Sequence, residues 1–168
     1  KSRVCEQFQM TRPVLQTHHS RIMVQEGRFL PLLERCQHLE TTYYPLNASF
    51  EKQVIVISGS NMGGKTVLLQ SIAFFQLLAQ MGFFVPAEKF ETVIFENMHY
   101  IGEQSHETVE GLSSFGLEMF RFMNAYGDIE GKTLYLIDEF ARTTNSHEAT
   151  ALISAVLRIL TEHSEVYT

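Results

Sequence analysis

From Gln53 onward, short apolar runs alternate with longer segments in which apolar residues recur at helical spacing. Gln53–Ser58 is β-branched and almost wholly apolar, which predicts a strand buried on both faces of a parallel sheet. Thr66–Met81 has no helix breaker and is followed by Gly82, which predicts a helix. The same reasoning predicts one or two strands within Phe90–Ile101, helices over Ser114–Tyr126 and His147–Glu162, and strands over Thr133–Ile137 and from Val166. Alternating strands and helices predict an α/β fold with a mostly parallel sheet flanked by helices.

The first 50 residues are less regular. Arg21–Val24 predicts a short strand that turns at Glu26 and Gly27, and Leu30–Leu33 predicts a second short apolar run. Tyr43–Asn47 is interpreted as a loop, because Pro45 disfavours helix at the residue before it. The length of 168 residues fits one domain, with residues 1–50 as a lead-in segment and residues 51–168 as its core.

Composition narrows the class of protein. Hydrophobic residues make up 45% of the chain and charged residues 19%, which predicts a folded core rather than disorder. Apolar runs fall well short of a membrane span, and Cys5 and Cys36 have no metal-site spacing, so we expect a cytoplasmic location with reduced thiols. With 13 basic and 19 acidic residues, the net charge of −6 predicts that the chain does not bind DNA by itself. Because residue 1 is lysine, we expect a piece of a longer protein.

A glycine-rich loop between the predicted strand and helix carries the clearest chemical signal. It fits the pattern G-x-x-x-x-G-K-[ST], whose backbone N–H groups and following helix N-terminus bind nucleotide phosphates. Lys65 would reach the β- and γ-phosphates of ATP, and the Thr66 hydroxyl would ligate Mg²⁺. The alternative is a glycine turn that happens to precede a lysine. The predicted ATP-binding residues are Gly59, Ser60, Asn61, Met62, Gly63, Gly64, Lys65 and Thr66.

Two acidic residues end the apolar strand predicted over Thr133–Ile137. Asp138 lies where ligand groups gather in open α/β sheets, and an aspartate there can hold Mg²⁺ through water. The adjacent Glu139 is then placed to orient or deprotonate the attacking water. Alternatively, the pair caps the next turn. Together with the phosphate loop, Asp138 and Glu139 predict a Mg²⁺-dependent ATPase.

Several strings resemble the MutS family of ATPases over roughly residues 27–168. Ser60–Lys65 is similar to that family's Pro-Asn-Met-Gly-Gly-Lys, and Gly82–Ala87 to its Gly-x-x-Val-Pro-Ala. Gly111–Met119 resembles the family signature Gly-x-Ser-x-Phe-x-x-Glu-Met, and Leu136–Glu139 resembles its acidic strand. The resemblance covers the ATPase domain of the family only, a P-loop NTPase of ABC-like architecture.

The resemblance implies a dimer, of two identical or two paired MutS-like subunits, that sandwiches two ATP molecules. By this likeness Ser113 would reach in trans to the γ-phosphate bound by the partner, although an N-cap is an equal alternative for this residue. Asn61 would touch the γ-phosphate or the water, or else serves only the turn. Tyr43 and Tyr44 lie near the place where the family stacks an aromatic ring on adenine, and packing in the core is the other interpretation.

The sequence also departs from the family pattern. Ala141–Thr144 stands in place of Gly-Arg-Gly-Thr, so two positions able to adopt positive φ carry a Cβ atom. Glu148-Ala149 replaces the usual Asp-Gly, and the chain stops before the family's Thr-His switch. His147 and His163 are interpreted as solvated helix residues and not as that switch.

Two functions from different classes follow from the resemblance. In the first, ATP binding and hydrolysis drive conformational change in a parent protein that binds mismatched DNA for repair. In the second, the ATPase belongs to a chaperone that reactivates a cobalamin-dependent aminomutase. The string Phe140–Asn145 resembles the MutS-like ATPases of such chaperones more closely than it resembles mismatch-repair proteins. A third, a nucleotide-binding module without turnover, is disfavoured by the presence of Lys65, Asp138 and Glu139.

Overall fold

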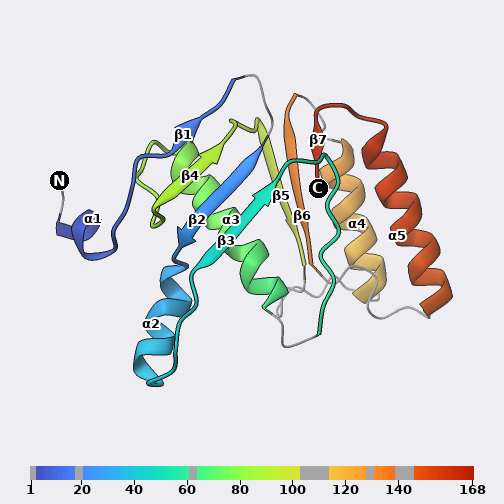
Figure 1. Ribbon diagram of the computed structural model, residues 1–168. Coiled ribbons are helices and arrows are strands. Elements are labelled where there is room, and N and C mark those ends of the chain that lie inside the picture. Colours follow the sequence, from blue (N-terminus) through green and yellow to red (C-terminus); the bar gives the residue numbers. More distant parts are fainter. Residues whose placement is uncertain (1–2, 18–20, 61–63, 103–113, 128–130, 139–145) are drawn as a thin grey trace. The chain divides into compact units, whose positions relative to one another are not determined.

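The computed structural model describes residues 3–17, 21–60, 64–102, 114–127, 131–138 and 146–168 (Figure 1). The chain divides into two compact units, which are described separately. The first comprises Lys1–Lys52 and Ser58–Ile94, and the second comprises Gln53–Ile57 and Phe95–Thr168. Among the described residues, no helix is long and apolar enough to cross a membrane.

The first unit contains a four-stranded sheet. Its elements are α1 (Arg3–Gln7), β1 (Val14–Leu15), β2 (Ile22–Gly27), α2 (Leu30–His38), β3 (Leu46–Phe50), α3 (Lys65–Gln80) and β4 (Lys89–Thr92). The strand order is β1-β4-β2-β3, in which only β1 and β4 run parallel. The expectation of a mostly parallel sheet is therefore wrong for this unit, because β2 runs antiparallel to both of its neighbours, β3 and β4.

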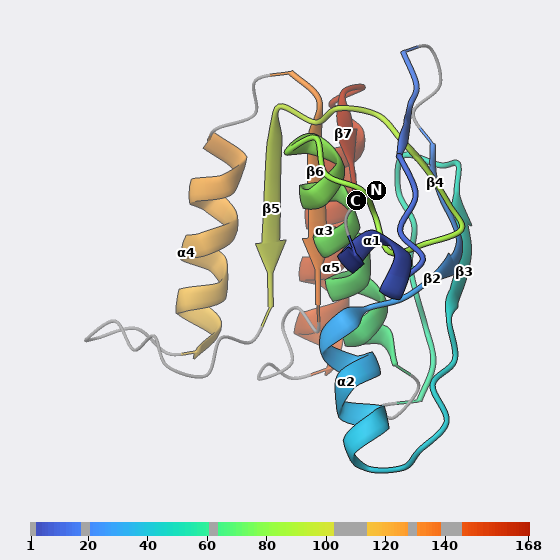
Figure 2. The ribbon, with the colours of Figure 1, turned by 90° about the vertical axis from the view of Figure 1, so that its left-hand side faces the viewer.

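Helix α3 packs against one face of this sheet, as both views show (Figures 1 and 2). The Phe75 ring is fully buried and meets the Phe90 ring of β4 edge to face, with centroids 5.8 Å apart. Val24 of β2 is 1% exposed in the same core. The observed helix, Lys65–Gln80, agrees with the prediction of Thr66–Met81 to within one residue at each end. Its position against the sheet sets where Lys65, the first residue of the helix, lies in this unit.

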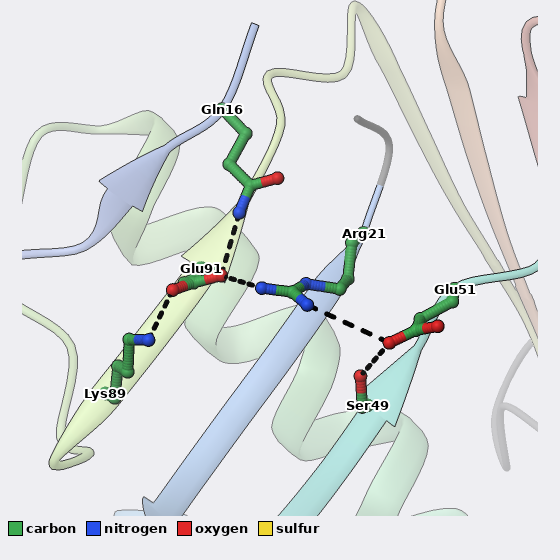
Figure 3. Close-up of polar contacts among 6 residues, drawn as sticks. All are labelled: Gln16, Arg21, Ser49, Glu51, Lys89 and Glu91. Atoms are coloured by element: carbon green, nitrogen blue, oxygen red, sulfur yellow. Dashed lines mark hydrogen bonds and ion pairs between the residues drawn. The ribbon is translucent and has the colours of Figure 1, made fainter. Parts of the chain in front are cut away.

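A network of charged and amide side chains ties the strands of this sheet together (Figure 3). Glu91 of β4 has a side chain only 9% exposed and forms ion pairs with Lys89 and Arg21. Gln16, next to β1, donates a hydrogen bond to it at 2.8 Å, and Arg21 also pairs with Glu51, next to β3, at 3.8 Å. These contacts hold the pKa of Glu91 below its usual value, chiefly through the hydrogen bonds from Lys89 and Arg21. The ionised form of Glu91 thus stabilises the folded sheet.

The second unit contains the parallel sheet that the sequence predicts. Its elements are β5 (Asn97–Ile101), α4 (Ser114–Gly127), β6 (Thr133–Ile137), α5 (Ser146–Thr161) and β7 (Val166–Tyr167). The strands follow the order β5-β6-β7, all parallel, so their carboxyl ends share one edge. From Asn97 onward the predicted elements are confirmed to within a residue or two, with the strands of Phe90–Ile101 divided between β4 and β5 of different units.

Helices α4 and α5 lie on the same side of this sheet (Figures 1 and 2). Tyr135 of β6 is fully buried there with Phe122 of α4 and Leu160 of α5. Its hydroxyl donates a 2.8 Å hydrogen bond to the carbonyl of Ala125, one of the last four carbonyls of α4, which lack partners within the helix. The buried tyrosine therefore also satisfies a carbonyl group at the C-terminal end of α4.

The strand predicted over Gln53–Ser58 is absent. Gln53 and Val54 lie in a bend and the rest of the segment has no regular structure. Its backbone hydrogen bonds to other described residues run from Ile55 N to Thr168 O at 2.7 Å and from Thr168 N to Gln53 O at 2.8 Å. Val56 is 72% exposed, so the segment is not buried on both faces. An apolar run becomes a buried strand where other strands pair with it along its length. Thr168 alone does not provide such pairing.

The strand predicted over Arg21–Val24 is present as β2, but three other details of the lead-in segment differ from the predictions. Leu30–Leu33 is the first turn of α2, in which Pro31 occupies an early helical position that needs no N–H donor. Strand β3 begins at Leu46, inside the predicted loop, and its half-buried and exposed residues alternate. Strand β2 continues to Gly27 instead of turning at Glu26, because a bulge with Glu26 at φ 49° absorbs the irregularity.

Candidate nucleotide site

The start of α3 has the geometry of an anion site. The helix begins at Lys65, and Gly64 before it adopts the left-handed conformation at φ 76°, which favours glycine. A Cβ atom at Gly64 would meet no described heavy atom within 4 Å, so the space beside the loop is open. Gly64 supplies no capping side chain to the first N–H groups of α3, and a helix N-terminus favours an anion.

The Lys65 side chain folds over the loop that precedes it. Its Nζ donates hydrogen bonds to the carbonyl of Gly59 at 2.9 Å and to that of Ser60 at 2.7 Å. An ammonium group has three donors, so one remains for a further acceptor above the loop. The predicted residues Asn61, Met62 and Gly63 lie outside the described residues.

Two residues predicted to hold Mg²⁺ carry oxygen groups, one in each unit. Thr66 is exposed in the first turn of α3, with its hydroxyl accessible, and Asp138 offers a half-buried carboxylate. Mg²⁺ prefers such oxygen ligands and is commonly held by one or two protein groups together with phosphates and waters. Thr66 belongs to the first unit and Asp138 to the second, so each is described only within its own unit.

Asp138 directly follows β6, at the edge where the parallel strands of the second unit end. Its N–H donates a 2.7 Å hydrogen bond to the carbonyl of Ile101, which continues the β5–β6 ladder by one residue. Its Oδ2 accepts a hydrogen bond of 3.3 Å from the Tyr100 hydroxyl. Sequence reasoning missed Tyr100, because only the parallel register of β5 and β6 brings it beside Asp138. Glu139 and Ser113 lie outside the described residues.

The two tyrosines of the lead-in segment have different surroundings. The Tyr43 hydroxyl accepts a 2.8 Å hydrogen bond from the Phe29 N–H and donates one of 3.4 Å to the Gly27 carbonyl. Burial raises the pKa of that hydroxyl. Tyr43 therefore fastens the turn between β2 and α2, whereas Tyr44 is 82% exposed and its ring is accessible.

The interpretation of His163 as a solvated helix residue is wrong. His163 follows the end of α5 and is half-buried, and its Nε2 lies 3.1 Å from the Tyr126 hydroxyl. The two rings meet edge to face with centroids 5.7 Å apart. The helix ends at Thr161, one residue earlier than predicted, and the His163 ring lies beyond it against Tyr126 of α4. The side chain of His147 lies outside the described residues.

The family model for MutS domain V matches residues 55–168. The chain belongs to the MutS family. Domain V is the ATPase domain of that family, whose members bind ATP with Mg²⁺ and act as dimers. The match covers the phosphate loop, α3 and the whole second unit except its first two residues.

Relatives of this MutS-family chain include DNA mismatch repair protein MSH3 of Candida glabrata, 31% identical over 92% of the chain and 15% of the relative. DNA mismatch repair protein MutS of a Geobacillus species is 32% identical over 84% of the chain and 16% of the relative. MutS of Salinibacter ruber is 31% identical over 97% of the chain and 18% of the relative. The chain thus spans about a sixth of the length of these relatives.

Proposed function

We propose that this chain is the Mg²⁺-dependent ATP-binding and ATP-hydrolysing domain of a longer MutS-family protein. The observation that carries the proposal is the junction of the phosphate loop with α3. There Gly64 turns through positive φ, the helix N-terminus is free of a capping side chain, and Lys65 Nζ stands over the loop. A triphosphate is the ligand whose charge and size suit such a site.

Each residue of the loop then has a role. The backbone N–H groups of residues 59–66 bind phosphate oxygens, and Lys65 exchanges a carbonyl contact for the β- and γ-phosphates. The Thr66 hydroxyl and, through water, the Asp138 carboxylate hold Mg²⁺. Bound Mg·ATP supplies the bond to be cleaved and the charge neutralisation that phosphoryl transfer needs. The exposed ring of Tyr44 is better suited than Tyr43 to contact adenine, since the Tyr43 hydroxyl is already engaged.

The remaining proposals concern Glu139 and Ser113. Glu139, next to Asp138 at the carboxyl edge of the parallel sheet, orients or deprotonates the attacking water. Ser113, next to the first residue of α4, reaches in trans to the γ-phosphate bound by a second subunit. The second subunit is a copy of this chain or a paired MutS-like chain, and two ATP molecules are enclosed between them.

We further propose that the parent protein binds mismatched DNA and works in repair. The support is that relatives named DNA mismatch repair protein are similar to this chain over most of its length. The aminomutase-reactivating alternative rests on residues outside the described part of the structure, so repair is the function favoured. We place the protein in the cytoplasm.

Replacement of Glu139 by glutamine tests the hydrolytic part of the proposal. Phosphate release by the Glu139→Gln variant should be about 10²- to 10⁴-fold slower, because a positioned general base has been removed. ATP binding should persist, and sedimentation should show an ATP-dependent dimer. Glu165→Gln, a change of the same kind far along the chain, is the control. Hydrolysis at the rate of the unaltered chain would exclude the role given to Glu139.

A further inference from the structure

We propose that Tyr100 is a positioning residue for the Asp138 carboxylate, and that it sets the affinity of this site for Mg²⁺. The inference rests on the proposed function, in which Asp138 holds the metal. Tyr100 comes from β5, the strand next to β6, and its hydroxyl donates to Asp138 Oδ2 at 3.3 Å. Both residues belong to the second unit, so this contact lies within one compact body.

The contact between Tyr100 and Asp138 depends on a glycine at position 102, where a larger side chain would be too close to both residues. Gly102 lies just past the end of β5, between the tyrosine ring and the aspartate. A Cβ atom added there would lie 3.0 Å from a ring carbon of Tyr100 and 3.2 Å from Cβ of Asp138. Gly102 is buried, so a side chain there has little space to turn away. The tyrosine ring therefore rests against the chain in the orientation that its hydrogen bond requires.

The hydrogen bond restricts a side chain that is otherwise free to rotate. The terminal torsion of an aspartate is broad and roughly two-fold, so an unrestrained carboxylate samples many orientations. A donor on Oδ2 fixes the carboxylate plane and leaves Oδ1 as the oxygen turned away from Tyr100. A metal-bound water that approaches Oδ1 then meets an oriented acceptor, and loss of such an outer partner typically weakens metal binding 10- to 100-fold.

The test uses a fluorescent ATP analogue and compares the affinity of the chain for it in Mg²⁺ and in EDTA. The ratio of the two affinities reports how well the protein holds the metal beside the nucleotide. Tyr100→Phe keeps the ring and removes the hydroxyl, and it should lower the ratio about tenfold while the affinity in EDTA stays unchanged. Asp138→Asn should lower the ratio at least as far.

Two further variants sharpen the result. Tyr126→Phe removes a tyrosine hydroxyl that bonds His163 in the same unit, and it should leave the ratio unchanged. Gly102→Ala should lower the ratio, because the new Cβ displaces the ring of Tyr100. Melting temperatures of all variants establish that they are folded.

The outcomes separate this inference from the proposed function. A Tyr100→Phe ratio equal to that of the unaltered chain, with a low ratio for Asp138→Asn, overturns the role of Tyr100 and leaves the metal role of Asp138. An equal loss of affinity in Mg²⁺ and in EDTA also overturns it, because a structural defect would act on both. Absence of nucleotide binding by the unaltered chain overturns the proposed function itself.

Discussion

Gln76 joins the helix that follows the phosphate loop to strand β4, and its replacement should destabilise the first unit. Its side chain is fully buried, and its Nε2 donates a 2.8 Å hydrogen bond to the carbonyl of Val93. Its Oε1 accepts a hydrogen bond from the hydroxyl of Thr92, which is also fully buried. Gln76→Leu keeps a side chain of similar shape but leaves both of these groups without their partner.

The expected magnitude follows from these two groups. A buried polar group left unsatisfied costs about 1 to 3 kcal/mol, so the pair costs about 2 to 6 kcal/mol. Burial of apolar leucine atoms offsets about 1 kcal/mol of this. A further 3.3 Å contact from the Thr92 hydroxyl to the Val93 carbonyl recovers part of the rest. We expect the free energy of unfolding to fall by about 1 to 4 kcal/mol.

Urea unfolding followed by circular dichroism measures this change. Gln70→Leu, the same substitution at an exposed position of α3, should stay within about 0.5 kcal/mol of the unaltered chain. Thr92→Val removes the partner hydroxyl, so the double variant Gln76→Leu/Thr92→Val should cost about 1 kcal/mol less than the sum of the single variants. A Gln76→Leu variant as stable as Gln70→Leu, or strict additivity, would refute this reasoning.

Two other predictions concern charge. Because ion pairing lowers the pKa of Glu91 below its ordinary value of 4.5, its contribution to stability is present above that pH and is lost as the pH falls through the lowered pKa. Glu91→Gln should therefore lower the free energy of unfolding by about 1 to 3 kcal/mol at pH 7. Urea unfolding at pH 7 and pH 3 should show that the difference between the variant and the unaltered chain shrinks in acid, and an equal difference at both pH values would contradict this. The net charge of −6 predicts no measurable binding of a labelled mismatched duplex by fluorescence anisotropy at low or moderate salt, whereas tight, salt-sensitive binding would reveal a basic surface built by the fold.

The sequence predicted the second unit well because its elements are long and strongly periodic or wholly apolar. Thr133–Ile137 is a strand with the predicted bounds, and Ser114–Tyr126 differs from α4 by one residue. Tertiary contacts decided the rest. Gln53–Ser58 reads as a buried strand, yet Val56 is exposed, because pairing partners and not apolar character make a strand.

The lead-in segment shows the limits of local pattern more clearly. Half-buried and exposed positions alternate along Leu46–Phe50, as in a strand with one covered face. The prediction of a loop relied instead on the preceding Pro45. The network around Glu91 could not have been predicted, since it joins residues about 70 positions apart in the chain. At the candidate site, the phosphate loop was readable from its spacing, whereas the partner of Asp138 was not. Tyr100 lies 38 residues before Asp138, and only the parallel register of β5 and β6 brings the two together.

The central claim is that the loop ending at Lys65 binds the phosphates of Mg·ATP, and isothermal titration calorimetry tests it most directly. The unaltered chain should bind Mg·ATP, and Lys65→Ala should weaken binding about 10- to 100-fold, the loss expected for charge-assisted hydrogen bonds to phosphate. Lys52→Ala removes an exposed lysine outside the loop and should bind as the unaltered chain does. Equal affinities for the unaltered chain and Lys65→Ala, or no binding by either, would contradict the account.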